Sequence, residues 1–199
     1  MKNFSFSFLF SLISICNIFS QWNSQEFKLT GSVLESIDLV LKGDSKNAFC
    51  ALRPPGHHAT ADRGMGFCIF NNVAVAARYA QSKYGLDRVA IIDWDVHHGN
   101  GTEAIFYDRD DVLAISIHQE RNYPVDTGME IDRGKGKGLG CNVNLPLPAG
   151  SGHSTYLNVF DKVVTPLVNN YRPDIIIVAC GFDAAMIDPT SSMLCSAET

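Results

Sequence analysis

Three features that mark well-defined protein classes are missing from this sequence of 199 residues. It has no stripe of lysine and arginine, because 16 basic residues are outnumbered by 21 acidic ones and the net charge is −5. Its six cysteines form no C-x-x-C pair and no zinc-finger spacing. No apolar run is both long and unbroken enough for a confident membrane span. These absences argue against direct nucleic-acid binding, a cysteine-based metal finger and a transmembrane protein.

The first twenty residues differ in composition from the rest of the chain. They carry one lysine and no acid in a run of Phe, Leu, Ile and Ser, which is typical of a secretory signal peptide. Serines and Asn17 interrupt the run, however, and no A-x-A-like cleavage site follows it. Two interpretations stay open for residues 1–29: a leader, or a wrongly predicted start. In both, the domain covers residues 30–199.

From about residue 30 the chain alternates between helical and strand patterns. Ser32 and Glu35 have the spacing of a capping box and predict a helix start, and Gly43 predicts the end of that helix. Two more helices are predicted over residues 71–84 and 153–170. Short apolar runs predict buried strands at residues 48–52, 89–93, 112–117, 142–147 and 174–180. Strands this apolar are covered on both faces, which indicates a parallel sheet between two layers of helices.

Polar residues gather where the predicted strands end. The segment 90–101, AIIDWDVHHGNG, runs from an apolar strand into two aspartates, two histidines and two glycines. Burying such groups unpaired would cost several kcal/mol each, so the segment is typical of a built site. Asp95 and His97 alternate with their neighbours, and in extended chain both would point to one side. Asp183 follows the last strand, and ligands of open α/β sheets bind beyond the carboxyl ends of strands.

These residue types suit a catalytic metal ion. Asp95, His97 and Asp183 would give three protein ligands and leave a fourth position open, as in catalytic zinc sites. The vicinal pair His57 and His58, on a loop that contains two prolines, could supply a base beside the metal. Asp93 and Asn100 are candidates to orient these two imidazoles.

Each motif also has a simpler interpretation. An Asp-x-His after a strand can be a turn, adjacent histidines can lie on the surface, and Asp183 could cap a helix. His118 and His153 are interpreted as structural. The agreement of three motifs at three predicted strand ends favours a functional site.

Five segments together resemble the histone deacetylase superfamily, on its class II and bacterial amidohydrolase side. They are RPPGHH (53–58), GMGFCIFNN (64–72), DWDVHHGNGT (93–102), ISIH (115–118) and GFDA (181–184). The resemblance covers about residues 32–189. It implies an α/β fold of the three-layer arginase–deacetylase type, with a parallel sheet of about eight strands and helices on both faces. It also implies zinc-assisted hydrolysis of an acetyl-lysine amide, in histones or other proteins, or of a related acetylated small amine.

The resemblance assigns roles to individual residues of this sequence. It implies Zn²⁺ on Asp95, His97 and Asp183, with His58 as general base and acid, Asn100 as its partner, and His57 backed by Asp93. It implies a structural K⁺ on Asp93, Asp95, His97, Ser116 and the Ile117 carbonyl. A second monovalent ion would use carbonyls around Phe106, Arg109 and Val112. The substrate tunnel would be lined by Gly66, Phe67 and Tyr123.

The sequence also departs from the family pattern. The family places a transition-state tyrosine in a Gly-Gly-Tyr segment well beyond the third zinc ligand, and none of the six tyrosines here has that position. Loss of one oxyanion donor typically costs about 10²–10³ in rate. We therefore expect a domain that lacks its C-terminal part and is short at its front, and a weakly active or inactive chain.

Three other functions stay open. An acetylpolyamine or other small-amide hydrolase would use the same chemistry, and a non-catalytic module would bind zinc and acetyl-lysine without turnover. A ureohydrolase of arginase type shares the fold but bridges two manganese ions with more ligands than this sequence offers. The family works in the cytoplasm and nucleus, and a true leader at residues 1–20 would instead make the protein secretory.

Overall fold

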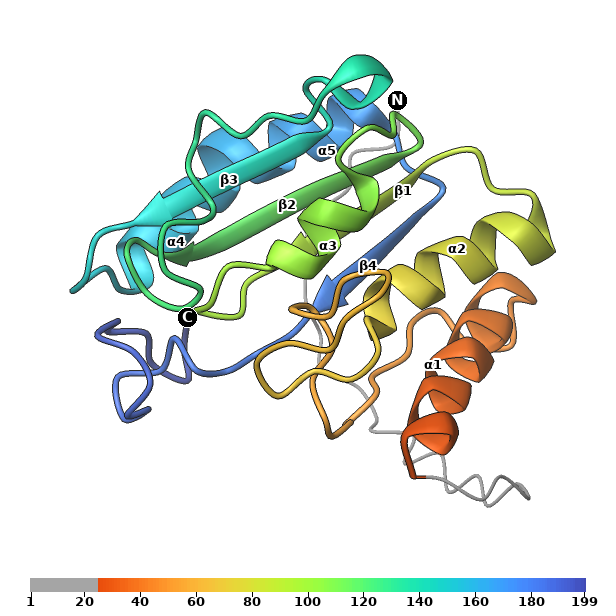
Figure 1. The fold of residues 1–199 in the computed structure, drawn as a ribbon, viewed down its shortest axis with the longest axis horizontal. Coiled ribbons are helices and arrows are strands. Elements are labelled where there is room, and N and C mark those ends of the chain that lie inside the picture. The colour runs from red at the N-terminus through yellow and green to blue at the C-terminus, as the bar shows by residue number, and fades with distance from the viewer. Residues whose placement is uncertain (1–24) are drawn as a thin grey trace.

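Four parallel strands form the central sheet (Figure 1). The structure is a computed structural model that describes residues 25–199. Across the sheet the strands follow the order β3 (Asn142–Leu147), β2 (Val112–Gln119), β1 (Val89–Asp93) and β4 (Ile175–Ala179). β1 is buried along its whole length, and β2 is buried except at its last residue. The predicted parallel α/β sheet is therefore confirmed.

Helices cover both faces of this sheet, because alternate residues of the central strands point to opposite sides. Ala90 and Ile92 share a core with the helical segment after β3, whereas Val89 and Ile91 pack with α2 (Asn72–Tyr84) and α3 (Asn100–Phe106). Figure 1 shows α2 and α3 on one side of the sheet and α4 and α5 on the other. The three layers follow the prediction.

The helical segment after β3 is continuous but not uniform. It consists of α4 (His153–Val159), a π turn (η2, Phe160–Val164) and α5 (Thr165–Tyr171). Pro166 lies at the start of α5 and has no amide proton to donate, which accounts for a break in the regular α pattern beside it. The predicted long helix at residues 153–170 is confirmed apart from this turn.

The first described helix begins earlier than the sequence predicts. α1 spans Gln25–Leu41, so Ser32 lies inside the helix and does not cap it. A Ser-x-x-Glu spacing marks a start only where the chain before it cannot continue the helix, and Gly31 lowers helix propensity by only about 1 kcal/mol. α1 crosses the predicted boundary between residues 29 and 30. Residues 1–24, which include most of the predicted leader, lie outside the described part of the chain.

One predicted strand is wrong, and another is less covered than expected. Residues 48–52 form no strand, and Phe49 is 53% exposed, because the described chain places no neighbouring strand beside this apolar run. β4 lies at the sheet edge with β1 as its one neighbour, and Ile176 is 40% exposed. Between residues 25 and 199, no helix is long and apolar enough to cross a membrane.

Candidate functional site

The predicted site residues lie together at the end of the sheet where the parallel strands have their carboxyl ends. Asp93 is the last residue of β1 and lies level with Ser116 of β2 and Ala179 of β4. The turn after β1 carries Asp95 and His97, and the chain beyond β4 carries Asp183. Parallel strands therefore place three chain segments at this end.

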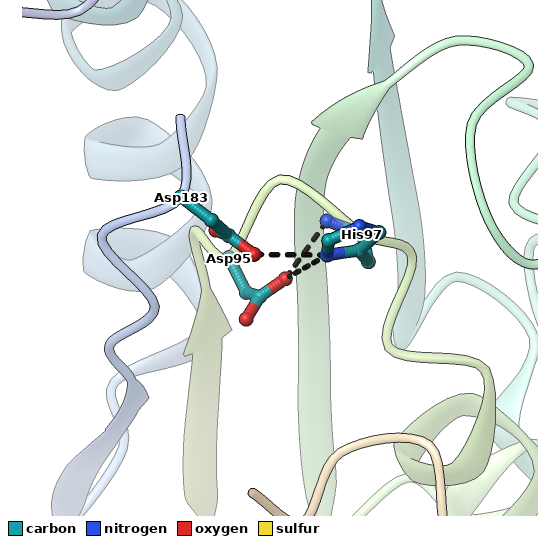
Figure 2. A group of neighbouring side chains, drawn as sticks. All are labelled: Asp95, His97 and Asp183. Atoms are coloured by element: carbon teal, nitrogen blue, oxygen red, sulfur yellow. Dashed lines mark hydrogen bonds and ion pairs between the residues drawn. The ribbon is translucent and has the colours of Figure 1, made fainter. Parts of the chain in front are cut away.

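Asp95, His97 and Asp183 form a compact cluster (Figure 2). One possible ligand atom from each lies within 4.8 Å of the other two. The His97 Nδ1 lies 3.0 Å from the Asp95 Oδ1 and 2.9 Å from the Asp183 Oδ2. Burial lowers the pKa of His97, but the two carboxylates outweigh it and raise that pKa to about 10. Two carboxylates thus converge on a point that favours a positive charge.

The geometry of this cluster differs from the extended chain that the sequence suggested. Residues 95–97 form a bend, and the Asp95 Oδ1 accepts the His97 backbone N–H at 2.8 Å. The other Asp183 oxygen, Oδ1, accepts the Val96 N–H at 2.8 Å. A turn, and not strand alternation, therefore brings Asp95 and His97 together. Asp183 caps no α-helix, because a turn follows it.

His57 and Asp93 form a buried pair beside the cluster. The His57 Nδ1 lies 2.7 Å from the Asp93 Oδ2, and the two side chains are 5% and 3% exposed. Burial lowers the pKa of His57, but the Asp93 carboxylate outweighs this effect and raises it to about 9. Burial also raises the pKa of Asp93, while the contact with His57 opposes that rise. The pair therefore retains a proton at neutral pH.

His58 has the opposite electrostatic character. Burial and the charge of His57, whose ring centroid is 4.0 Å away, lower the pKa of His58 to about 4. The His58 Nδ1 lies 2.8 Å from the Asn100 Oδ1, an atom that can only accept a hydrogen bond. The amide nitrogen of Asn100 donates to the Met65 sulfur. Nδ1 therefore carries the proton of a neutral ring, and Nε2 is free to accept one.

The loop that carries these two histidines follows no strand, and α2 and α3 hold it instead. Two amides in the first turn of α3, on Gly101 and Thr102, donate to the His57 carbonyl at 3.0 and 3.2 Å. The Asn71 side chain caps α2 by accepting the Ala74 N–H, and its amide nitrogen donates to the Ala59 carbonyl. The N-terminal ends of α2 and α3, and not the strand predicted at residues 48–52, therefore hold this loop in place.

Two of the three predicted tunnel residues lie against His58. The Tyr123 ring is edge-on to His58, with 5.0 Å between ring centroids, and is 39% exposed. Gly66 has φ +58°, and a Cβ on it would lie 2.8 Å from the His58 ring and 3.3 Å from Tyr123. Phe67, by contrast, is 86% exposed.

The structure also reveals buried polar residues that the sequence left without a role. His98 and His118 are each 2% exposed, and Glu103 accepts hydrogen bonds from Asn142 and Asn144 at 2.7 and 2.6 Å. His98 and His118 lie within the DWDVHHGNGT and ISIH segments, and each is a polar side chain within or beside an apolar strand. A cavity of about 10 Å³, room for one water molecule, borders this group. Its polar lining residues are Asp93, Thr102, Glu103, Ser116, Asn142 and Asn144.

Comparison with known proteins places this chain in one family. The model of the histone deacetylase domain matches residues 7–199. The chain is 47% identical over 163 residues to a histone deacetylase-like amidohydrolase of Pseudomonas aeruginosa, which covers 82% of this chain. The chain therefore belongs to the histone deacetylase family.

Two solved structures share the fold. The HDA15 HD domain has a TM-score of 0.80 and 41% identity over 84% of this chain. An acetylpolyamine aminohydrolase from Burkholderia pseudomallei has a TM-score of 0.78 and 39% identity over 83% of this chain. The chain spans 43% of the Pseudomonas protein, and 49% and 48% of these two structures.

Proposed function

We propose that the protein is a zinc-dependent deacetylase and that this chain supplies the metal ligands and the proton-transfer residue of its active site. One observation carries the proposal: two carboxylates and an imidazole converge within 4.8 Å beside a histidine whose Nε2 is free. Membership of the histone deacetylase family supports hydrolysis of an amide as the reaction.

The residues of the cluster fit a zinc ion. Carboxylate oxygen and imidazole nitrogen are both zinc ligands, and three of them leave a position open for water or substrate. The raised pKa of His97 supports the fit, because it reflects the negative potential that a cation would neutralise. Zinc bound by Asp95, His97 and Asp183 would polarise the amide carbonyl and make a water molecule more acidic.

The histidine pair divides the remaining work. His58 Nε2 accepts a proton from the attacking water and returns it to the amine nitrogen as the amide C–N bond breaks. Asn100 holds the tautomer that makes this possible, because its Oδ1 binds the proton on Nδ1. His57 stays protonated beside Asp93, and its positive charge stabilises the negative charge that develops on the carbonyl oxygen. The products are acetate and a free amine.

A potassium ion is proposed on Asp93, Asp95, His97, Ser116 and the Ile117 carbonyl. The strand register supports this, since Asp93 and Ser116 lie level on neighbouring strands and both border the small cavity. Oxygen ligands of this kind suit a hard cation. The second monovalent site, at the carbonyls of Phe106, Arg109 and Val112, stays a prediction.

The proposed substrate is an acetylated lysine side chain that passes between Gly66, Phe67 and Tyr123. An acetylated polyamine is the second candidate, because the chain is 39% identical to an acetylpolyamine aminohydrolase. A third possibility is a module that binds zinc and acetyl-lysine without hydrolysing it.

One assay separates the three. The zinc-loaded protein is incubated with an acetyl-lysine peptide or with an N-acetylated diamine, and released acetate is measured. Faster release from the peptide supports the proposal, and faster release from the diamine supports the polyamine reaction. Binding of the peptide without acetate release from either compound would mean a non-catalytic module.

A further inference from the structure

A second group of buried polar side chains lies beside the candidate metal site and has no role in the chemistry proposed above. His98 lies between β1 and α3, His118 lies in β2, and their ring centroids are 4.8 Å apart. Both are almost fully buried, where polar atoms without partners would be costly. One ring nitrogen of each has a partner on the irregular segment that follows β2, whereas the His118 Nδ1 lies 3.0 Å from the Ser116 hydroxyl and the His98 Nε2 has no hydrogen bond within the described residues. We call residues 122–132 of that segment the Tyr123 loop.

The two histidines hold the middle of the Tyr123 loop. The His118 Nε2 donates to the Gly128 carbonyl at 2.9 Å, because a carbonyl oxygen can only accept. The Thr127 hydroxyl donates to the Pro124 carbonyl at 2.8 Å, so its oxygen accepts from the His98 Nδ1 at 2.9 Å. Two adjacent loop residues are thus fixed by two buried rings.

Two asparagines of β3 hold the far end of the same loop. The Asn142 amide nitrogen donates to the Asp132 carbonyl at 2.7 Å, and that of Asn144 donates to the Met129 carbonyl at 3.3 Å. Both amides also donate to the Glu103 Oε2, which fixes their orientation. A segment without regular structure is therefore anchored through its own backbone carbonyls.

The packing between loop and rings leaves no spare room. Gly128 has φ +73°, and a Cβ on it would lie 2.5 Å from the His118 Nε2 and 2.7 Å from the His98 Cγ. The near end of the loop carries Tyr123, whose ring lies edge-on to His58 and 6.4 Å from the His97 ring centroid. A displacement of the backbone at Gly128 would therefore also move Tyr123, which lies beside His58.

We propose that His98 and His118 are positioning residues: by fixing Thr127 and Gly128 they hold Tyr123 against His58 and shape the substrate's approach to the metal. This inference rests on the proposed function, because it takes the space beside Tyr123 as the substrate path. The metal ligands, His58 and Asn100 come from other segments. Release of the loop should therefore weaken substrate binding far more than the chemical step.

The test compares Gly128→Ala with Gly136→Ala. Both glycines have positive φ, +73° and +58°, but nothing lies within 4 Å of a Cβ on Gly136, so this control carries the backbone strain without the clash. Amide hydrogen exchange of residues 122–132 reports loop anchoring, with β1 and β2 as references for global stability. The affinity of the zinc-loaded protein for an acetyl-lysine peptide reports the site, whether or not the peptide is hydrolysed.

We expect G128A to speed exchange in the loop and to raise the peptide Kd and KM about tenfold, with kcat changed less than about twofold. We expect G136A to match the parent protein, and zinc content to be equal in all three. Equal loop exchange, Kd and KM in G128A and G136A would overturn the inference. A parent protein that does not bind the peptide would overturn both proposals. Binding without turnover would overturn only the proposed hydrolysis.

A second pair of variants tests His118 directly. His118→Gln can present an amide nitrogen near the position of Nε2, whereas the shorter His118→Asn cannot reach the Gly128 carbonyl. We expect H118Q to retain parent-like loop exchange and KM, and H118N to resemble G128A. Failure of H118Q to restore either measurement, with β1 and β2 still protected, would count against positioning through this hydrogen bond.

Discussion

The His58 Nδ1 lies 2.8 Å from the Asn100 Oδ1, and this contact decides which ring nitrogen is free to accept a proton. The pKa of His58, lowered to about 4, keeps the ring neutral over the physiological range. His57, whose ring centroid lies 4.0 Å from that of His58, has its pKa raised to about 9 by Asp93. Of the two adjacent histidines, His58 is thus neutral and ready to accept a proton, and His57 is protonated and able to stabilise negative charge.

Replacement of His58 tests its role as the base. We expect His58→Gln to lower kcat by about 10²–10⁴, the usual contribution of a general base, because a glutamine side chain cannot take up the proton. Zinc content should not change, since His58 is not among the converging ligands. Acetate release by H58Q within threefold of the parent protein, at equal zinc content, would show that another group acts as the base.

The pH profile tests the contact with Asn100. Asn100→Asp would place a carboxylate beside Nδ1 and raise the pKa of His58, so that the base becomes protonated at a higher pH. The acidic limb of kcat/KM should move upward, and activity should fall more at pH 6 than at pH 8. Asn158→Asp, on the exposed side of α4, adds the same charge elsewhere as a control. An unshifted acidic limb in N100D would contradict the assignment.

Proton release tests the charge state of His97. Its pKa, raised to about 10, means that the ring is protonated at pH 8 without metal, and it must lose that proton to bind zinc. We expect zinc binding at pH 8 to release about one proton per chain. Without metal, stability gained from this group is full below the ordinary histidine pKa and is lost as the pH rises towards 10.

Titration calorimetry in buffers of different ionisation enthalpy measures this release. Zinc binding whose enthalpy does not depend on the buffer would contradict a protonated His97.

Asn71 links the histidine loop to α2 and should matter for stability. Its Oδ1 caps the helix, and its amide nitrogen donates to the Ala59 carbonyl and the Thr102 hydroxyl. We expect Asn71→Ala to lower the free energy of unfolding by about 2–3 kcal/mol, through the lost cap and the unsatisfied buried carbonyl. The exposed Asn158→Ala should stay within about 0.5 kcal/mol. Equal urea midpoints for the two variants would contradict this role.

Much of the fold could be predicted because the central strands are unbroken apolar runs that end in polar residues. The bounds of β1, β2, β3 and α2 lie within two residues of the prediction, and the structure adds that Asn71 caps α2. The prediction of a strand at residues 48–52 is wrong because a strand also needs a neighbouring strand to pair with, and an apolar run does not show whether one exists. The predicted start of α1 is wrong because the Ser-x-x-Glu spacing occurs inside helices as well as at their starts.

The residues of the candidate site could be predicted where residues with metal-binding or proton-transfer side chains lie close together in the sequence. The structure brings Asp183 to Asp95 and His97, as the strand-end rule predicted, although a turn and not strand alternation joins the latter two. The anchoring of the Tyr123 loop could not be predicted. The partner of His118 is the carbonyl of Gly128, and every residue carries that group, so neither composition nor periodicity points to it.

Metal content tests the central claim most directly. The protein is stripped with a chelator, reloaded in an equal excess of zinc and manganese, passed through a desalting column and analysed by mass spectrometry for both metals. We predict about one zinc per chain in the parent and in Asp161→Asn, an exposed acid paired with Lys162, and less than about one tenth of that in Asp183→Asn. Equal zinc in D183N and the parent, or two manganese ions per chain, would contradict the account.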